Sequence, residues 1–250
     1  MPPTFTLSAA SQVSNPAIDV VFVHGLGGSP SDSWTHIEGA KQIHWPTLLG
    51  EHLRSANVSI LGYPTSKLGK LLGGSDLGLL PAAAGVVDLL LSHGIGKRPL
   101  YIVAHSLGGI VAKAALRQCA DSTDPRKQQL LASTQGVVLI GVPNSGASMG
   151  NVCKNLPGLA SMQAAELARA DTILMDLGQW FRGRAGVDKI RCHCFYETER
   201  LNGVLVVDAA SANPGIDGCD PIPVTSDHVQ IAKIPSAEHS AFKSIVAFID

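Results

Sequence analysis

Short apolar runs alternate with amphipathic stretches along the chain. Apolar runs without regular polar positions are typical of strands buried on both faces, and they predict strands at 19–25, 58–64, 100–105, 136–143, 189–197 and 221–224. The run at 204–209 is predicted to be an extension or edge piece. Helical spacing predicts helices at 45–56, 79–94, 107–120, 163–181 and 236–249, and the glycine-rich stretch 66–78 is predicted to be a loop.

Strands that alternate with helices predict an α/β fold, with a mostly parallel sheet flanked by helices on both faces. The 250 residues suit a single domain, residues 1–250. One stretch, 149–188, lies in a long gap without strand signal. An insert at the carboxyl edge of a parallel sheet lies where ligands bind. We predict a helical cap or lid there, and an ordinary crossover helix is the alternative.

Composition narrows the class of protein further. The formal net charge is −1 and the basic residues do not cluster, so nucleic acid and anionic membranes are not expected partners. The first residues lack the pattern of a secretory signal, and no apolar run is long enough to span a bilayer, which predicts a cytoplasmic protein.

The 5 cysteines lack paired metal-site spacing and are expected to be buried, reduced thiols. A metal site at Cys192, His193 and Cys194 is the alternative, although it would be one ligand short for zinc.

Two serines carry a nucleophile signature. Ser148 lies in a strict G-x-S-x-G at 146–150, and Ser106 lies in A-H-S-L-G at 104–108, where alanine replaces the first glycine. A nucleophile elbow needs a strand before the serine, a helix after it, and small residues two positions to either side. Ser106 has these flanks, and the helix that follows places its positive dipole end beside the hydroxyl. We therefore predict Ser106 as the nucleophile and Ser148 as a loop residue.

The backbone near Ser106 predicts an oxyanion hole. One N–H group would come from Leu107, directly after the serine, and the other from Leu26 in the H-G-L-G-G that follows the first strand. Gly25 and Gly27 allow the backbone to approach a substrate closely. These two glycines and His105 are predicted to contact the substrate.

A general base is expected late in the chain, after the last strand. His228 fits, because it lies in a loop just past the strand at 221–224. His239 is expected within the terminal helix, and His193 lies in the middle of a strand. The acid should lie between the serine and the histidine in sequence.

Glu197 lies at the end of the strand predicted at 189–197, which comes after the insert, and it is therefore the predicted acid. Glu199 and Asp208 are the alternatives. Asp227 lies next to His228 and is poorly placed to orient its ring.

These motifs together resemble a known superfamily. The stretches F-V-H-G-L-G-G, S-D-S-W, A-H-S-L-G-G, G-V-P-N-S-G-A, C-F-Y-E, V-V-D-A-A-S-A and D-H resemble the alpha/beta hydrolases. More narrowly, they are similar to the lipase-like serine esterases related to GPI-inositol deacylases, a group that includes the serine-active-site-containing proteins. The resemblance runs from about Val20 to the terminal helix. It implies Ser106 as nucleophile, His228 as base and Glu197 as acid, although many relatives carry aspartate at the last position.

The expected activity is hydrolysis of carboxylic esters, small or lipid, through an acyl-enzyme, with no cofactor and no metal. A thioesterase or amidase using the same residues is an alternative, because the acyl-enzyme is common to all three. A catalytically silent binding module on this scaffold is another. Trp180 and its apolar neighbours in the insert are predicted to line an acyl pocket, or else to pack as ordinary core: Leu167, Ile173, Leu174, Leu177 and Phe181.

Overall fold

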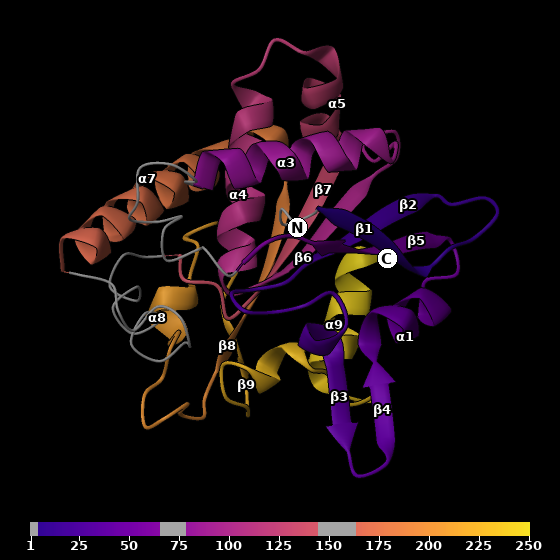
Figure 1. Cartoon of the computed structure of the whole chain (residues 1–250), viewed down its shortest axis with the longest axis vertical. Coiled ribbons are helices and arrows are strands. Elements are labelled where there is room, and N and C mark those ends of the chain that lie inside the picture. Colours follow the sequence, from indigo (N-terminus) through magenta and orange to yellow (C-terminus); the bar gives the residue numbers. More distant parts are fainter. Residues whose placement is uncertain (1–4, 66–78, 145–163) are drawn as a thin grey trace.

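A computed structural model describes residues 5–65, 79–144 and 164–250, with the backbone alone for 164–170. Within these residues, seven strands form one sheet in the order β1-β5-β2-β6-β7-β8-β9 (Figure 1). β1 joins β5 antiparallel, and all the other neighbours are parallel. The sheet strands are β1 Thr6–Ser11, β2 Ile18–Val23, β5 Ala56–Gly62, β6 Leu100–His105, β7 Thr134–Ile140, β8 Arg191–Glu197 and β9 Ile222–Val224.

Helices cover both faces of the sheet (Figure 1). Successive strand residues point to opposite faces, so Val21 and Ile102 join one apolar core while Phe22 and Val103 join the other. Both faces are therefore dry, which explains why the strands read as continuous apolar runs. The helices of the first core are α3 Leu79–Ser92, α4 Leu107–Ala120, α5 Pro125–Ser133 and α7 Ala164–Asp188; those of the second are α1 Trp45–His52 and α9 Ser240–Ile249.

The predicted fold class is confirmed, and several elements differ from their prediction. The strand or edge piece predicted at 204–209 is wrong: Val204 makes an isolated bridge to Leu201, and α8, Ala209–Ala212, starts at the end of the run. The terminal helix begins at Ser240, later than predicted, with His239 as its N-cap. The loop predicted at 66–78 lies outside the described residues.

Further elements of the described chain were not predicted. β1 is rich in small and polar residues, and it exists because β5 offers it a hydrogen-bonding edge. A two-stranded hairpin, β3 Thr35–Glu38 and β4 Lys41–His44, turns at Gly39, whose φ is 59°. Helix α5 begins with a strong local signal, because the Asp124 side chain accepts a hydrogen bond from the Arg126 N–H.

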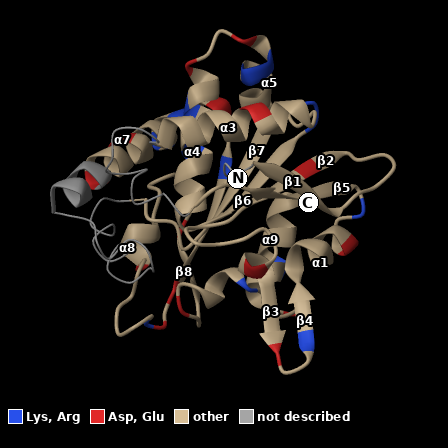
Figure 2. Cartoon of the chain, viewed as in Figure 1, with Lys and Arg blue, Asp and Glu red and all other residues tan. Residues whose placement is uncertain are grey.

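The surface carries charges of both signs, dispersed over helices, strands and loops (Figure 2). This distribution agrees with the formal net charge of −1. In the described part of the chain, no helix has the length and apolar character needed to cross a membrane.

Candidate active site

Ser106 stands at a sharp turn between β6 and α4. Its φ of 51° and ψ of −126° are an uncommon backbone conformation for a residue with a side chain, and strain of this kind concentrates at functional sites. The Ser106 N–H donates to the Ile140 carbonyl, 3.0 Å away, which ties the turn to β7. A Cβ at Gly108 would lie 2.3 Å from the Val23 carbonyl oxygen, so only glycine lets α4 start this close to β2. The local features predicted for a nucleophile elbow are present at Ser106.

A hydrogen-bonded row links three side chains that are far apart in sequence. The Nε2 atom of His228 lies 2.9 Å from the Ser106 hydroxyl, and its Nδ1 atom lies 3.3 Å from the Glu197 carboxylate. Ser106 is 1% exposed, and the other two are 0% exposed. We call these residues the Ser–His–Glu row. Ser106 and His228 follow β6 and β9, and Glu197 is the last residue of β8. The carboxyl ends of these three parallel strands lie at the same edge of the sheet.

Of the three candidate acids, the structure brings Glu197 to the histidine. Its Oε1 atom also accepts a hydrogen bond from the Val207 N–H, which holds the carboxylate in place. Asp208 has a different task, since its carboxylate accepts from the Ser211 N–H at the start of α8. Glu199 is exposed and its backbone N–H donates to Ser226. The carboxylate of Asp227 caps the turn after His228 by accepting from the N–H groups of the next two residues.

Gly141 supports the row and was not predicted. It follows β7 with a φ of 54°, a conformation that favours glycine. A Cβ at this position would lie 3.3 Å from the His228 ring and 3.4 Å from the Glu197 Oε2 atom. The only signal in the sequence is a glycine directly after an apolar run, in I-G-V-P, which is too common a pattern to indicate a site.

The side chain of His105 contacts the backbone of His228. Its Nε2 atom lies 2.9 Å from the His228 carbonyl oxygen. Burial, reinforced by the nearby His228 ring, lowers the pKa of His105 to about 3, so its imidazole is neutral and its Nε2–H donates to that carbonyl. Burial also lowers the pKa of His24, whose ring stacks on Tyr63 and whose Nδ1 atom lies 2.9 Å from the Gly25 carbonyl. Both histidines brace the backbone around the row.

The row opens into a cavity of about 290 Å³. Leu26 sits in a turn closed by the Gly28 N–H and the Gly25 carbonyl, 3.2 Å apart, with Gly27 at a φ of 64°. Leu107 begins α4 directly after the serine. The predicted substrate contacts Gly25, Gly27 and His105 all line the cavity, as do the following described residues: Leu26, Gly28, Ser29, Asp32, Ser33, Ser106, His228, Val229 and Lys233.

Other predicted positions lie elsewhere. Trp180 is on α7 beside Arg117, whose guanidinium carbon lies 6.0 Å from the ring centroid, and it is not among the described residues that line the cavity. Leu174, Leu177 and Phe181 are buried in the core shared with α4. Ser148, Leu167 and the first half of the predicted insert fall outside the described side chains, so the cap remains a prediction.

The alternative metal site is not assembled. The His193 Nε2 atom lies 2.8 Å from the Ser244 hydroxyl on α9, on the sheet face opposite Cys192 and Cys194. Among the described residues, no group of three or more histidine, cysteine or acidic side chains is arranged to hold a metal ion.

Comparison with known families adds an independent observation. The model of the alpha/beta hydrolase family matches residues 20–230, most of the chain. The chain belongs to the alpha/beta hydrolase family. Among curated proteins, this family member is similar to Protein SERAC1 from Danio rerio, with 28% identity over 92% of the chain, and to Protein SERAC1 from Homo sapiens, with 25% identity over 92%. The matches cover 38% of the length of those relatives.

Solved structures share the fold of this family member. A lipase of Bacillus licheniformis, BlEst2, has a TM-score of 0.58 at 15% identity, over 96% of this chain and 98% of its own. The enol-lactonase of Burkholderia xenovorans has a TM-score of 0.57 at 13% identity, over 99% and 96%. At these identities the likeness concerns the fold alone.

Proposed function

We propose that this alpha/beta hydrolase cleaves carboxylic esters, with Ser106 as nucleophile, His228 as general base and Glu197 as the acid that orients it. The observation that carries the proposal is the unbroken Ser–His–Glu row, which ends at the strained serine and opens into a cavity. A serine hydroxyl is a weak nucleophile at neutral pH and needs such a base within hydrogen-bonding distance.

The proposed reaction uses each member of the row once per half-cycle. The Ser106 oxygen attacks the ester carbonyl while its proton passes to His228 Nε2, and Glu197 accepts the Nδ1–H and stabilises the imidazolium. The carbonyl oxygen becomes an oxyanion, held by the N–H groups of Leu26 and Leu107. The C–O bond to the alcohol then breaks, and the alcohol leaves with the proton from His228. Water repeats the sequence on the acyl-enzyme and releases the acid.

The cavity walls support a small acyl group. Among the described residues that line the cavity, Leu26 and Val229 provide apolar side chains, whereas Asp32 and Lys233 are charged. A long acyl chain would need a longer apolar surface to offset its transfer from water, which is worth about 0.8 kcal/mol per buried CH₂. We therefore expect short-chain esters to be the better substrates.

Hydrolysis of p-nitrophenyl acetate, octanoate and palmitate tests this proposal. Ser106→Ala should lower kcat/KM at least about a thousandfold, because the nucleophile is lost. Ser92→Ala, an exposed serine on α3, is the matched control and should behave as wild type. Activity that survives in Ser106→Ala would overturn the assignment and direct attention to Ser148.

The two alternative functions, a thioesterase and a catalytically silent binding module, predict different results in the same assays. A thioester of the same acyl group, cleaved much faster than the oxygen ester, would indicate a thioesterase. A silent binding module would leave every ester, thioester and amide intact.

A further inference from the structure

A second buried polar cluster lies away from the Ser–His–Glu row. Cys192 and Cys194 lie two residues apart on β8, so both side chains point to the α4 face of the sheet. Cys219, in the loop before β9, places its sulfur 3.2 Å from that of Cys194. The three cysteines, which we call the thiol cluster, are 7%, 0% and 3% exposed.

A buried ammonium group accompanies the thiol cluster. Lys113 on α4 is 2% exposed, and its Nζ atom donates to the Asn144 side chain and lies 5.2 Å from the Phe181 ring centroid. Among the described side chains, no carboxylate forms an ion pair with it. A buried positive charge is costly unless a negative one balances it.

A thiolate in the thiol cluster would supply this balance. Hydrogen bonding with the Cys192 and Cys194 thiols lowers the pKa of Cys219 to about 4, and the charge of Lys113 acts in the same direction. The pKa of Cys192 and that of Cys194 are raised by the same hydrogen bonds. The thiolate is the reactive form of cysteine, so the lowered pKa favours Cys219 over its two neighbours as the attacking thiol.

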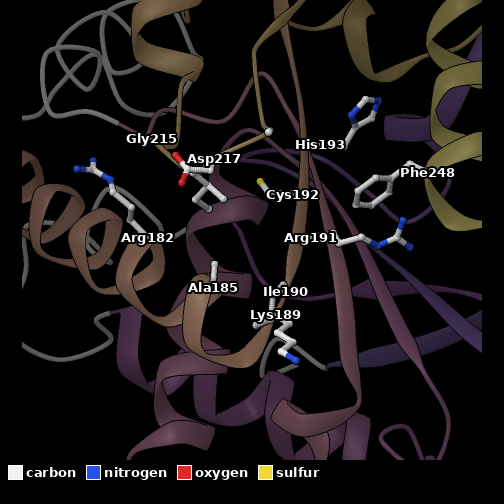
Figure 3. Close-up of a pocket in the computed structure, with 13 residues that line it drawn as sticks. Arg182, Ala185, Lys189, Ile190, Arg191, Cys192, His193, Gly215, Asp217 and Phe248 are labelled. Carbon is white, nitrogen blue, oxygen red and sulfur yellow. The ribbon is translucent and has the colours of Figure 1, made fainter.

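A separate cavity reaches this region. It has a volume of about 560 Å³, shares no lining residue with the cavity of the Ser–His–Glu row, and includes Cys192 and the Gly215–Gly218 segment that leads to Cys219. In Figure 3 the Cys192 sulfur points into the space below Gly215 and Asp217. The side chains of Arg182, Lys189 and Arg191 point in different directions in this view, so they form no cradle for an anion. The cavity thus brings a small neutral reagent to the thiol cluster on its Cys192 side, next to the segment that leads to Cys219.

We propose that the thiol cluster is a peroxide-reactive site, at which Cys219 and Cys194 become a disulfide. The Cys219 thiolate attacks one oxygen of hydrogen peroxide and the O–O bond breaks, which leaves a sulfenic acid and a hydroxide. This hydroxide becomes the first water by taking up from solvent the proton that the Cys219 thiol released when it ionised. The Cys194 sulfur then attacks the Cys219 sulfur and the S–O bond breaks. The departing hydroxide takes the Cys194 proton and leaves as the second water. Two thiols lose two electrons, and one peroxide is reduced to two waters.

Peptide mass spectrometry on the full chain tests this site. The Cys153→Ser background is used because Cys153 lies outside the described residues. The folded protein is treated with hydrogen peroxide, free thiols are alkylated, and crosslinked peptides are identified, while circular dichroism monitors the fold. We expect a Cys194–Cys219 crosslink. Cys119, which is buried on α4 and whose pKa burial raises to about 11, is the matched thiol and should stay reduced.

Two variants separate the formation of the sulfenic acid from the formation of the disulfide. Cys194→Ser should stop at a sulfenic acid on Cys219, which dimedone traps, and Cys219→Ser should leave Cys194 reduced. If either variant fails to fold, the crosslink in the Cys153→Ser chain remains the deciding measurement. A folded protein that forms no crosslink overturns the proposal. So does one that links Cys219 to Cys192 instead, or that oxidises Cys119 at the same rate.

Discussion

The Ser–His–Glu row and the thiol cluster with Lys113 are two buried polar groups built on the same elements. Helix α4 carries Ser106 at its start and Lys113 two turns later, and β8 carries Cys194 in its middle and Glu197 at its end. At the carboxyl edge of the sheet, side chains of several strands meet and open into a cavity. Further from that edge, the thiols of the thiol cluster and the ammonium group of Lys113 are enclosed by apolar side chains. Position along an element thus decides whether a polar side chain lies at the edge next to a cavity or within the core.

The largest expected effect comes from breaking the row at its centre. His228→Gln keeps a side chain of similar size but removes the base, so kcat/KM for p-nitrophenyl acetate should fall at least about a thousandfold. The measurement is steady-state hydrolysis. His239→Gln, at the N-cap of α9, is the control and should retain wild-type activity. A His228→Gln enzyme within tenfold of wild type would contradict the role of the row.

The second-largest expected effect is on the pH dependence of the free energy of unfolding, through the buried ammonium group of Lys113. Burial lowers the pKa of Lys113 from 10.5 to about 8. Between these values the unfolded chain holds a proton that the folded chain has released, so the free energy of unfolding should rise with pH over this window. A shift of this size corresponds to a rise of about 3 kcal/mol.

Lys113→Met removes this titration. Urea unfolding at pH 7.5 to 10.5 should therefore give a flatter profile for Lys113→Met than for wild type. Lys127→Met, on α5, is the control and should keep the wild-type slope. Parallel curves for wild type and Lys113→Met would mean that the ammonium is better solvated than its burial implies.

The smallest expected effect comes from adding one methyl group beside the Ser–His–Glu row, at Gly141. Gly141→Ala adds a methyl group against His228 and Glu197 at a left-handed φ, so it should lower stability by about 1–2 kcal/mol and kcat/KM by about tenfold. Gly183→Ala, on α7 with no atom near the added Cβ, should instead stabilise by up to about 1 kcal/mol. Thermal unfolding and ester hydrolysis of both variants check this pair. Equal effects of the two substitutions on stability and on kcat/KM would mean that Gly141 does not support the Ser–His–Glu row.

The sequence predicted the positions where chemistry and local structure coincide. The sequence favours Ser106 over the strict motif at Ser148 because an elbow depends on its flanking strand and helix, and these flanks are present. His228 and Glu197 followed from the order of strands, since the carboxyl ends of parallel strands share an edge.

Features that depend on neighbours distant in sequence were not predicted. The clamp on Glu197 by the Val207 N–H lies in a stretch that was expected to be an edge strand. The pairing of Cys194 with Cys219 and the burial of Lys113 arise only when β8, α4 and the loop before β9 come together. β1 was missed because its hydrogen bonds come from β5 and its own sequence is weakly apolar.

Labelling with a fluorophosphonate tests the central claim most directly, because the probe reacts with an activated serine whatever the natural substrate is. Intact mass followed by peptide mapping should show one adduct in the wild type, on Ser106, and none in Ser106→Ala. An adduct on Ser148, or equal labelling of wild type and Ser106→Ala, would contradict the account.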